Sequence, residues 1–172
     1  MPHSVVILLR VIHIIGGVFW AGTLLFVALF LEPAVREAGP DGAKVMQGLA
    51  RRGYMVVMPL VALLTILAGI GLLEEVSGGF HPEWMSSPIG ITLSLGAAVA
   101  ILAFIIGVTV VRPTVVKLGA LAPQLMQTPE GPAREALQAQ LQQLRNRLRV
   151  GGRVVAGMLA ITAVAMAVAR YV

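Results

Sequence analysis

Four long apolar runs limit this chain to very few folds. They cover about residues 5–31, 54–73, 88–111 and 152–171. An α-helix rises 1.5 Å per residue, so each run is near or above the roughly 20 residues that cross a hydrocarbon core about 30 Å thick. Charged residues make up only 12% of the chain, too few to cover a soluble domain. We therefore predict an all-α, polytopic membrane protein in which residues 1–172 form a single integral membrane domain.

The basic residues predict the orientation of the chain in the membrane. Eleven of the 13 Lys and Arg residues lie after the first run or after the third run, and the segment between the second and third runs has none. The positive-inside rule places these two basic loops in the cytoplasm and both termini outside. The charges adjoin the spans and lack an aromatic stacking platform, which favours membrane lipids as partners and argues against nucleic acid.

An internal repeat predicts how the four helices are arranged. "FLEPAVREAG" and "VVRPTVVKLG" align without gaps, which pairs Pro33 with Pro113 and Gly39 with Gly119. "RRGYMVVMPLVALLTILAG" likewise resembles "RVGGRVVAGMLAITAVAMA". Each half is then a helical hairpin that starts outside. We predict an antiparallel bundle of four transmembrane helices, built from two parallel-repeat hairpins around an approximate twofold axis.

The two basic loops are predicted to form cytoplasmic helical extensions. In about residues 130–150, leucines recur at spacings of four, three and four, with Gln and Arg on the other face: Leu137, Leu141, Leu144 and Leu148. A shorter counterpart follows the first span. We expect the two extensions to pack together, the alternative being amphipathic helices that lie on lipid. Glu32 and Arg112 occupy matching places in the repeat and are expected to pair near the axis.

The repeat breaks at an arginine and a histidine within the first span. Arg10 and His13 align with a glycine and a leucine in the second half. At 100° per residue, Arg10, His13, Gly17 and Trp20 share one broad helix face. Small residues on that face indicate either close helix packing or a slot for a flat cofactor. Ionisable residues inside membranes are often functional, so we predict a pocket around His13 in the outer half.

Depth along the spans suggests which residues accompany His13. His13 lies roughly 12 Å, and Met166 roughly 9 Å, below the outer ends of their helices, counting 1.5 Å per residue. Haem requires an axial ligand, room for the ring and cations for its propionates, and His13 and Arg10 supply the first and part of the third. The ligation is expected to be by His13 alone, by His13 and Met166, or by His13 with His3 or His81 reaching in. Copper held by His13 and Met166 is the alternative metal site.

The stretch "LRVIHIIGGVFWAGTLLFVALFLEPAV" resembles the first helix of a superfamily of small bacterial four-helix membrane proteins. This superfamily includes the copper-resistance D-like proteins and the haem-containing, oxygen-independent protoporphyrinogen oxidase family. Their pattern has an early histidine followed by an aromatic residue, a small residue and glycine, here Trp20, Ala21 and Gly22. The resemblance implies a bacterial cytoplasmic membrane protein in which His13 is a haem or metal ligand.

Three functions remain open at this point. The first is a haem b-binding redox or electron-transfer protein with a cofactor pocket of Arg10, His13, Gly17, Trp20 and Met166. The second is an accessory or structural subunit of a larger membrane complex or homo-oligomer, without its own cofactor. The third is a copper-handling membrane protein. Cysteine is absent, which excludes disulfides and thiolate metal sites. The sequence has no P-loop, catalytic triad or dinucleotide fingerprint, so it assigns no enzymatic reaction.

Overall fold

Four long helices account for most of the chain. The computed structural model describes residues 1–172, apart from the side chain of residue 40. The first helix runs through α1 (His3–Phe26), the π-helix η1 (Val27–Leu31) and α2 (Glu32–Glu37), and the second is α4 (Tyr54–Val76). The third runs through α6 (Pro88–Ile106), the π-helix η2 (Gly107–Val111) and α7 (Arg112–Gln127). The fourth is α8 (Pro132–Val168) with a final turn, η3 (Ala169–Tyr171). Two short helices, α3 (Pro40–Arg51) and α5 (Pro82–Met85), join them.

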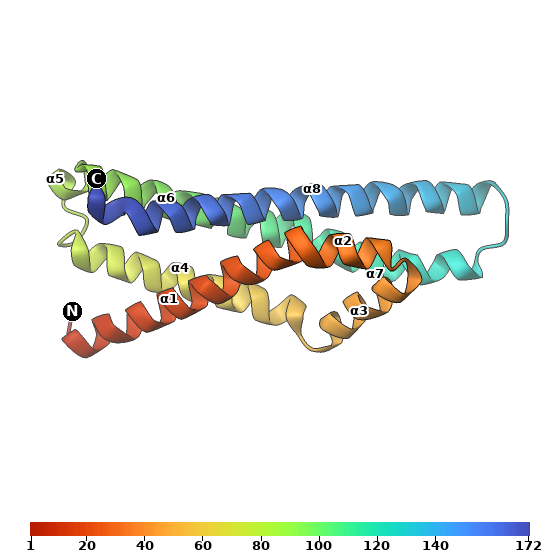
Figure 1. Ribbon diagram of the computed structural model, residues 1–172, viewed down its shortest axis with the longest axis horizontal. Helices are drawn as coiled ribbons and strands as arrows, with labels where there is room; N and C mark the ends of the chain where they lie inside the picture. Colours follow the sequence, from red (N-terminus) through yellow and green to blue (C-terminus); the bar gives the residue numbers. More distant parts are fainter.

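The helices form an antiparallel bundle, which confirms the predicted fold class. Both chain termini and α5 lie at one end, here called the terminal end, and the α7–α8 loop lies at the other, the extension end (Figure 1). The two helix pairs with the most contacts are α1 with α4 and α6 with α8. All four long helices contain a segment long and apolar enough to cross a membrane. The four predicted spans each fall within one of them, as expected of an integral membrane protein.

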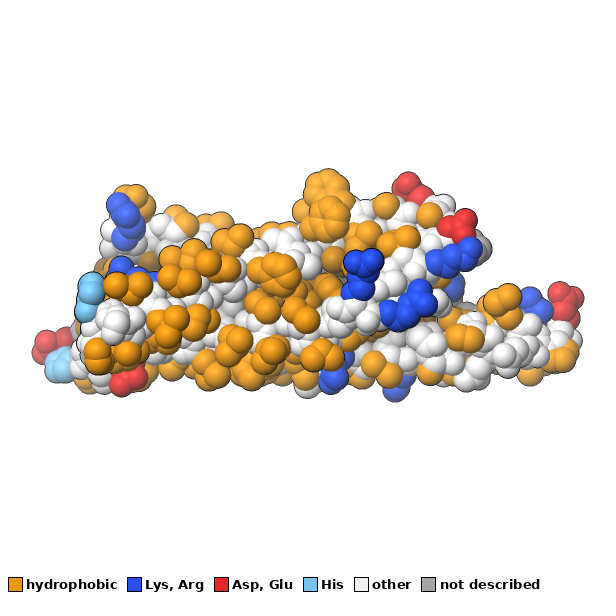
Figure 2. Space-filling view, turned by 90° about the horizontal axis from the view of Figure 1, so that it is seen from below, with side chains coloured by type: hydrophobic (Ala, Val, Ile, Leu, Met, Phe, Trp, Pro, Cys, Tyr) orange, Lys and Arg blue, Asp and Glu red, His pale blue; other side chains and the backbone are white. Residues whose placement is uncertain are grey.

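The surface of the bundle differs between the terminal end and the extension end. On the face shown in Figure 2, apolar side chains cover the half of the bundle near the histidines. Most Lys and Arg side chains on that face lie toward the other end. Large apolar side chains are exposed along all four helices, among them Ile15, Phe30, Leu67, Leu95 and Val164. Such a surface is stable only in contact with lipid or with another apolar surface.

The two π-helices confirm the repeat. η1 and η2 occupy matching places in the alignment that pairs Pro33 with Pro113, and each lies directly before a charged residue and a proline. In both, the backbone hydrogen bonds join residues that are five apart instead of four. Glu32 N–H donates to Val27 O, and Arg112 N–H donates to Gly107 O. Proline has no N–H and its ring collides with the carbonyl four residues earlier, so a widened turn lets each helix continue.

The extension end differs from the prediction in two ways. The leucine stripe of α8 is covered by α7, a helix that the sequence analysis did not assign, whereas α3 packs on α2 and α4. The expectation that the two extensions pack on each other is therefore wrong. Glu32 pairs with Arg153, whose Nη2 lies 3.8 Å from Glu32 Oε2, instead of the expected Arg112. The rotation of each helix about its own axis, which a sequence alignment does not report, decides this pairing.

Leu141 should hold the α7–α8 extension together. Its side chain is only 1% exposed, the least of any large side chain described in the bundle. Truncating a buried leucine leaves a cavity and lowers the stability of the elements around it. We expect Leu141→Ala to raise the rate of tryptic cleavage within residues 134–149 severalfold. The neighbouring exposed residue provides the control: Gln140→Ala should be cleaved like the wild type.

Candidate functional site

His13 lies in the interface between α1 and α4, where one of its two ring nitrogens forms a hydrogen bond. Its Nδ1 is 2.9 Å from the backbone carbonyl oxygen of Thr65. A carbonyl oxygen only accepts hydrogen bonds, so Nδ1 carries the proton and donates it. In the neutral imidazole, Nε2 then keeps its lone pair. The side chain is partly exposed. The site therefore presents an oriented imidazole whose free nitrogen can accept a proton or bind a metal.

The absence of a side chain at Gly69 makes room for the His13 ring. A Cβ built on Gly69 would lie 2.7 Å from Cε1 and 2.9 Å from Nδ1 of His13. Only a residue without a side chain leaves this space, so the imidazole fills the notch that Gly69 makes in α4. One turn earlier on α4, the Thr65 hydroxyl donates to Val61 O at 2.8 Å, which fixes its rotamer. The histidine is thus held by a hydrogen bond and by packing.

A glycine–threonine crossing lies next to the His13 site and recurs in the second hairpin. Gly16 packs so closely on Thr65 that a Cβ would overlap the threonine hydroxyl. The matching pair is Gly96 and Thr162, where Thr162 Oγ1 donates to the Gly96 carbonyl at 3.2 Å. Gly96 is the counterpart of Gly16 in the alignment that pairs Pro33 with Pro113. Each helix pair is therefore built on the same close crossing of small residues.

Next to this crossing the two hairpins diverge. Met166 stands one turn after Thr162, as Gly69 stands one turn after Thr65, and Leu93 is the counterpart of His13. In the first hairpin, the large side chain comes from α1 and the glycine from α4. In the second, α8 supplies Met166, whose Cε would lie 3.2 Å from a Cβ on Gly96. His13 and Met166 therefore lie in different helix pairs, His13 between α1 and α4 and Met166 between α8 and α6.

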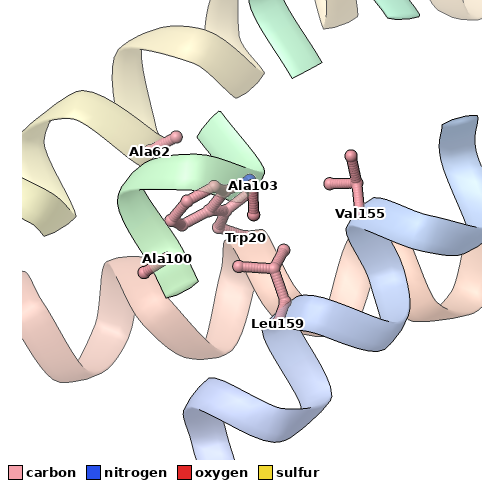
Figure 3. Packing of buried hydrophobic residues seen from close by; sticks show 6 residues of the cluster. All are labelled: Trp20, Ala62, Ala100, Ala103, Val155 and Leu159. Atoms are coloured by element: carbon pink, nitrogen blue, oxygen red, sulfur yellow. The ribbon is translucent and has the colours of Figure 1, made fainter. Parts of the chain in front are cut away.

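The other predicted site residues on α1 have different surroundings. Arg10 is exposed, one turn nearer the terminal end than His13. Gly17 faces α4, because a Cβ there would lie 3.8 Å from Thr65 Cγ2. Trp20 is only 5% exposed, at the centre of the core. Its indole packs among small and branched side chains of α4, α6 and α8 (Figure 3): Ala62, Ala100, Ala103, Val155 and Leu159.

Thr65 and Gly69 are the site residues that the sequence analysis missed. They form a small-x-x-x-small pair on α4, the pattern by which membrane helices approach closely. That signal was present, but the register of α4 against α1 was needed to place it opposite His13. No cluster of three or more His, Cys, Asp or Glu residues suited to a metal occurs among the described residues. Any metal at this site would depend on His13 and on ligands of another kind.

Comparisons with protein-family models, with curated proteins and with solved structures find no match to this chain.

Proposed function

We propose that this protein is a membrane redox protein that binds b-type haem through His13 Nε2. The observation that carries the proposal is the hydrogen bond from His13 Nδ1 to Thr65 O, 2.9 Å long. Histidines that ligate metals nearly always donate their other N–H to a carbonyl or carboxylate, which fixes the tautomer and raises the basicity of the ligating nitrogen. The structure of this site fits that role.

The surroundings of His13 fit a haem in three respects. The Gly69 notch holds the imidazole ring in place, so that Nε2 keeps a fixed direction. Arg10 lies one turn closer to the terminal end, is exposed and forms no ion pair with any described residue, so its guanidinium is available to a propionate. Large exposed apolar side chains adjoin His13 in the sequence, among them Val11 and Ile14, and they favour contact with an apolar ring. Met166 is the proposed second ligand, from the other hairpin.

Haem at this position would supply one-electron redox chemistry. The chain's own residues would set its properties. The Thr65 carbonyl strengthens His13 as a ligand through the Nδ1 hydrogen bond, and Arg10 balances propionate charge at the terminal end. By the distribution of basic residues, we place the extension end in the cytoplasm and His13 in the outer half of the membrane. Electrons would then be exchanged with a membrane-soluble or periplasmic partner.

The absorption spectrum of the purified protein tests this proposal. We expect wild-type protein from haem-replete cells to show a Soret band and His13→Ala to lack it. His81→Ala serves as the control, because His81 lies in the exposed turn before α5 and should leave the band unchanged. Met166→Leu should shift the band if Met166 is the second ligand. Colourless wild-type protein that does not change on addition of haem would contradict the proposal, and copper found by elemental analysis would point to the metal alternative.

A further inference from the structure

A groove with one charged residue runs between the first helix and α8. Its volume is about 310 Å³. Apolar and small side chains form both walls, and Arg153 is the charged residue among those that line it: Leu25, Ala28 and Leu29 on the first helix, and Arg153, Ala156 and Gly157 on α8. We call this the α1–α8 groove. It lies in the half of the bundle toward the extension end, away from His13.

The α1–α8 groove runs from charged residues into the apolar part of the bundle. Because the helices are antiparallel, positions from Pro33 back to Leu25 and positions from Arg153 on to Gly157 lead in the same direction. Two turns of helix correspond to about 11 Å. Glu32 directly follows the apolar run that ends at residue 31, and Arg153 is the second residue of the run that begins at residue 152. This places the pair at the level of lipid headgroups and the groove beside acyl chains.

The ion pair at the end of the groove is incompletely satisfied. Glu32 Oε2 is buried and accepts no hydrogen bond from the described residues. Its nearest cation, Arg153 Nη2, is 3.8 Å away, beyond hydrogen-bond distance. A buried acceptor without a donor costs free energy and calls for a partner. Arg153 lines the groove and Glu32 directly precedes Pro33, which also lines it. The Glu32 and Arg153 side chains are 29% and 56% exposed, so a headgroup can approach Arg153 and the exposed part of the Glu32 side chain.

We infer that the α1–α8 groove binds a phospholipid with an ethanolamine headgroup. One acyl chain lies along the apolar walls, the phosphate accepts hydrogen bonds from Arg153, and the primary ammonium donates to the Glu32 carboxylate. This headgroup carries an anion and a hydrogen-bond donor cation side by side, which complements an Arg/Glu pair. Phosphatidylcholine has no N–H to donate, and phosphatidylglycerol has no cation for Glu32. Charge-assisted hydrogen bonds of this kind are the strong ones.

Varying the lipid tests the inference without altering the protein. Delipidated full-length protein in detergent is mixed with dioleoyl phosphatidylethanolamine, its N-methyl and N,N-dimethyl derivatives, phosphatidylcholine or phosphatidylglycerol, and bound lipid is counted by native mass spectrometry. We expect affinity to fall along the methylation series, with a total loss of about tenfold from ethanolamine to choline. Equal binding of ethanolamine and choline lipids, or stronger binding of phosphatidylglycerol, would overturn the inference.

Three substitutions assign the binding to the groove. Glu32→Gln should bring the ratio of ethanolamine to choline binding close to one, while Arg153→Gln should weaken binding of both lipids. Gly157→Leu should block the groove; a Cβ at Gly157 meets no atom within 4 Å, so the helix itself tolerates the change. Gly22→Leu is the matched control, because a Cβ at Gly22 also meets nothing within 4 Å and Gly22 lies outside the groove. If Glu32→Gln still preferred the ethanolamine lipid, or if Gly157→Leu bound lipid as the wild type does, the proposed site would be wrong.

Discussion

Replacing Gly16 with valine is expected to lower the free energy of unfolding by about 2–3 kcal/mol, the cost of overpacking a close interface. A Cβ on Gly16 overlaps the Thr65 hydroxyl and lies 3.5 Å from Thr65 Cβ. Thr65 cannot turn away without cost, because it is 5% exposed and its hydroxyl donates to Val61 O at 2.8 Å. The α1 and α4 helices must therefore move apart, and the closest contact of the first hairpin is lost.

Two further valine substitutions make this experiment specific. Gly22→Val places the same side chain on the same helix where a Cβ meets nothing within 4 Å, so it reports the effect of valine on the helix alone. Gly96→Val should be intermediate, because its Cβ would lie 3.2 Å from Ala165 Cβ and from the flexible end of Met166. Loss of helical circular dichroism on heating in detergent measures all three. If the Gly16→Val and Gly22→Val proteins lose their helical signal at the same temperature, the close contact between Gly16 and Thr65 would be contradicted.

The sequence was sufficient to predict the four spans and their repeat. A span depends on the length and apolarity of a local run, which need no knowledge of neighbours, and a repeat is a comparison of the chain with itself. The alignment of the two halves also brings the two π-helices into register, although their geometry could not be foreseen. The alignment places Pro33 opposite Pro113, and a proline disturbs the helical turn that precedes it wherever it stands.

The parts that could not be predicted depend on how helices are rotated and aligned. α7 was missed because Gly119 and Pro123 disfavour a helix interior, whereas packing of α7 on α8 stabilises one. The partner of Glu32 depends on which face of α8 turns toward it. The same holds for Thr65 and Gly69: small residues at this spacing are common in membrane helices, and only the register between α1 and α4 places them against His13.

Substituting alanine for Gly69 is expected to reduce haem content by about tenfold or more, if His13 is the ligand proposed above. The added Cβ would lie 2.7 Å from His13 Cε1 and 2.9 Å from Nδ1, so the ring must leave its notch and its hydrogen bond to Thr65 O. Loss of the group that orients a metal-ligating histidine commonly lowers metal affinity by roughly 10- to 100-fold. The Soret absorbance per protein measures the effect, and Gly157→Ala, on α8 where a Cβ meets nothing within 4 Å, is the control.

The second hairpin supplies a way to separate folding from ligation at this position. It carries Leu93 at the position that aligns with His13, and Met166 one turn after Thr162, as Gly69 stands one turn after Thr65. The double variant His13→Leu with Gly69→Met therefore gives the first hairpin the packing residues of the second. We expect it to melt closer to wild type than Gly69→Met alone, because removing the imidazole makes room for the new side chain, and to bind no haem. Haem binding by the double variant would show that the ligand lies elsewhere. A melting temperature no higher than that of Gly69→Met would show that the two hairpins are not packed alike at this position.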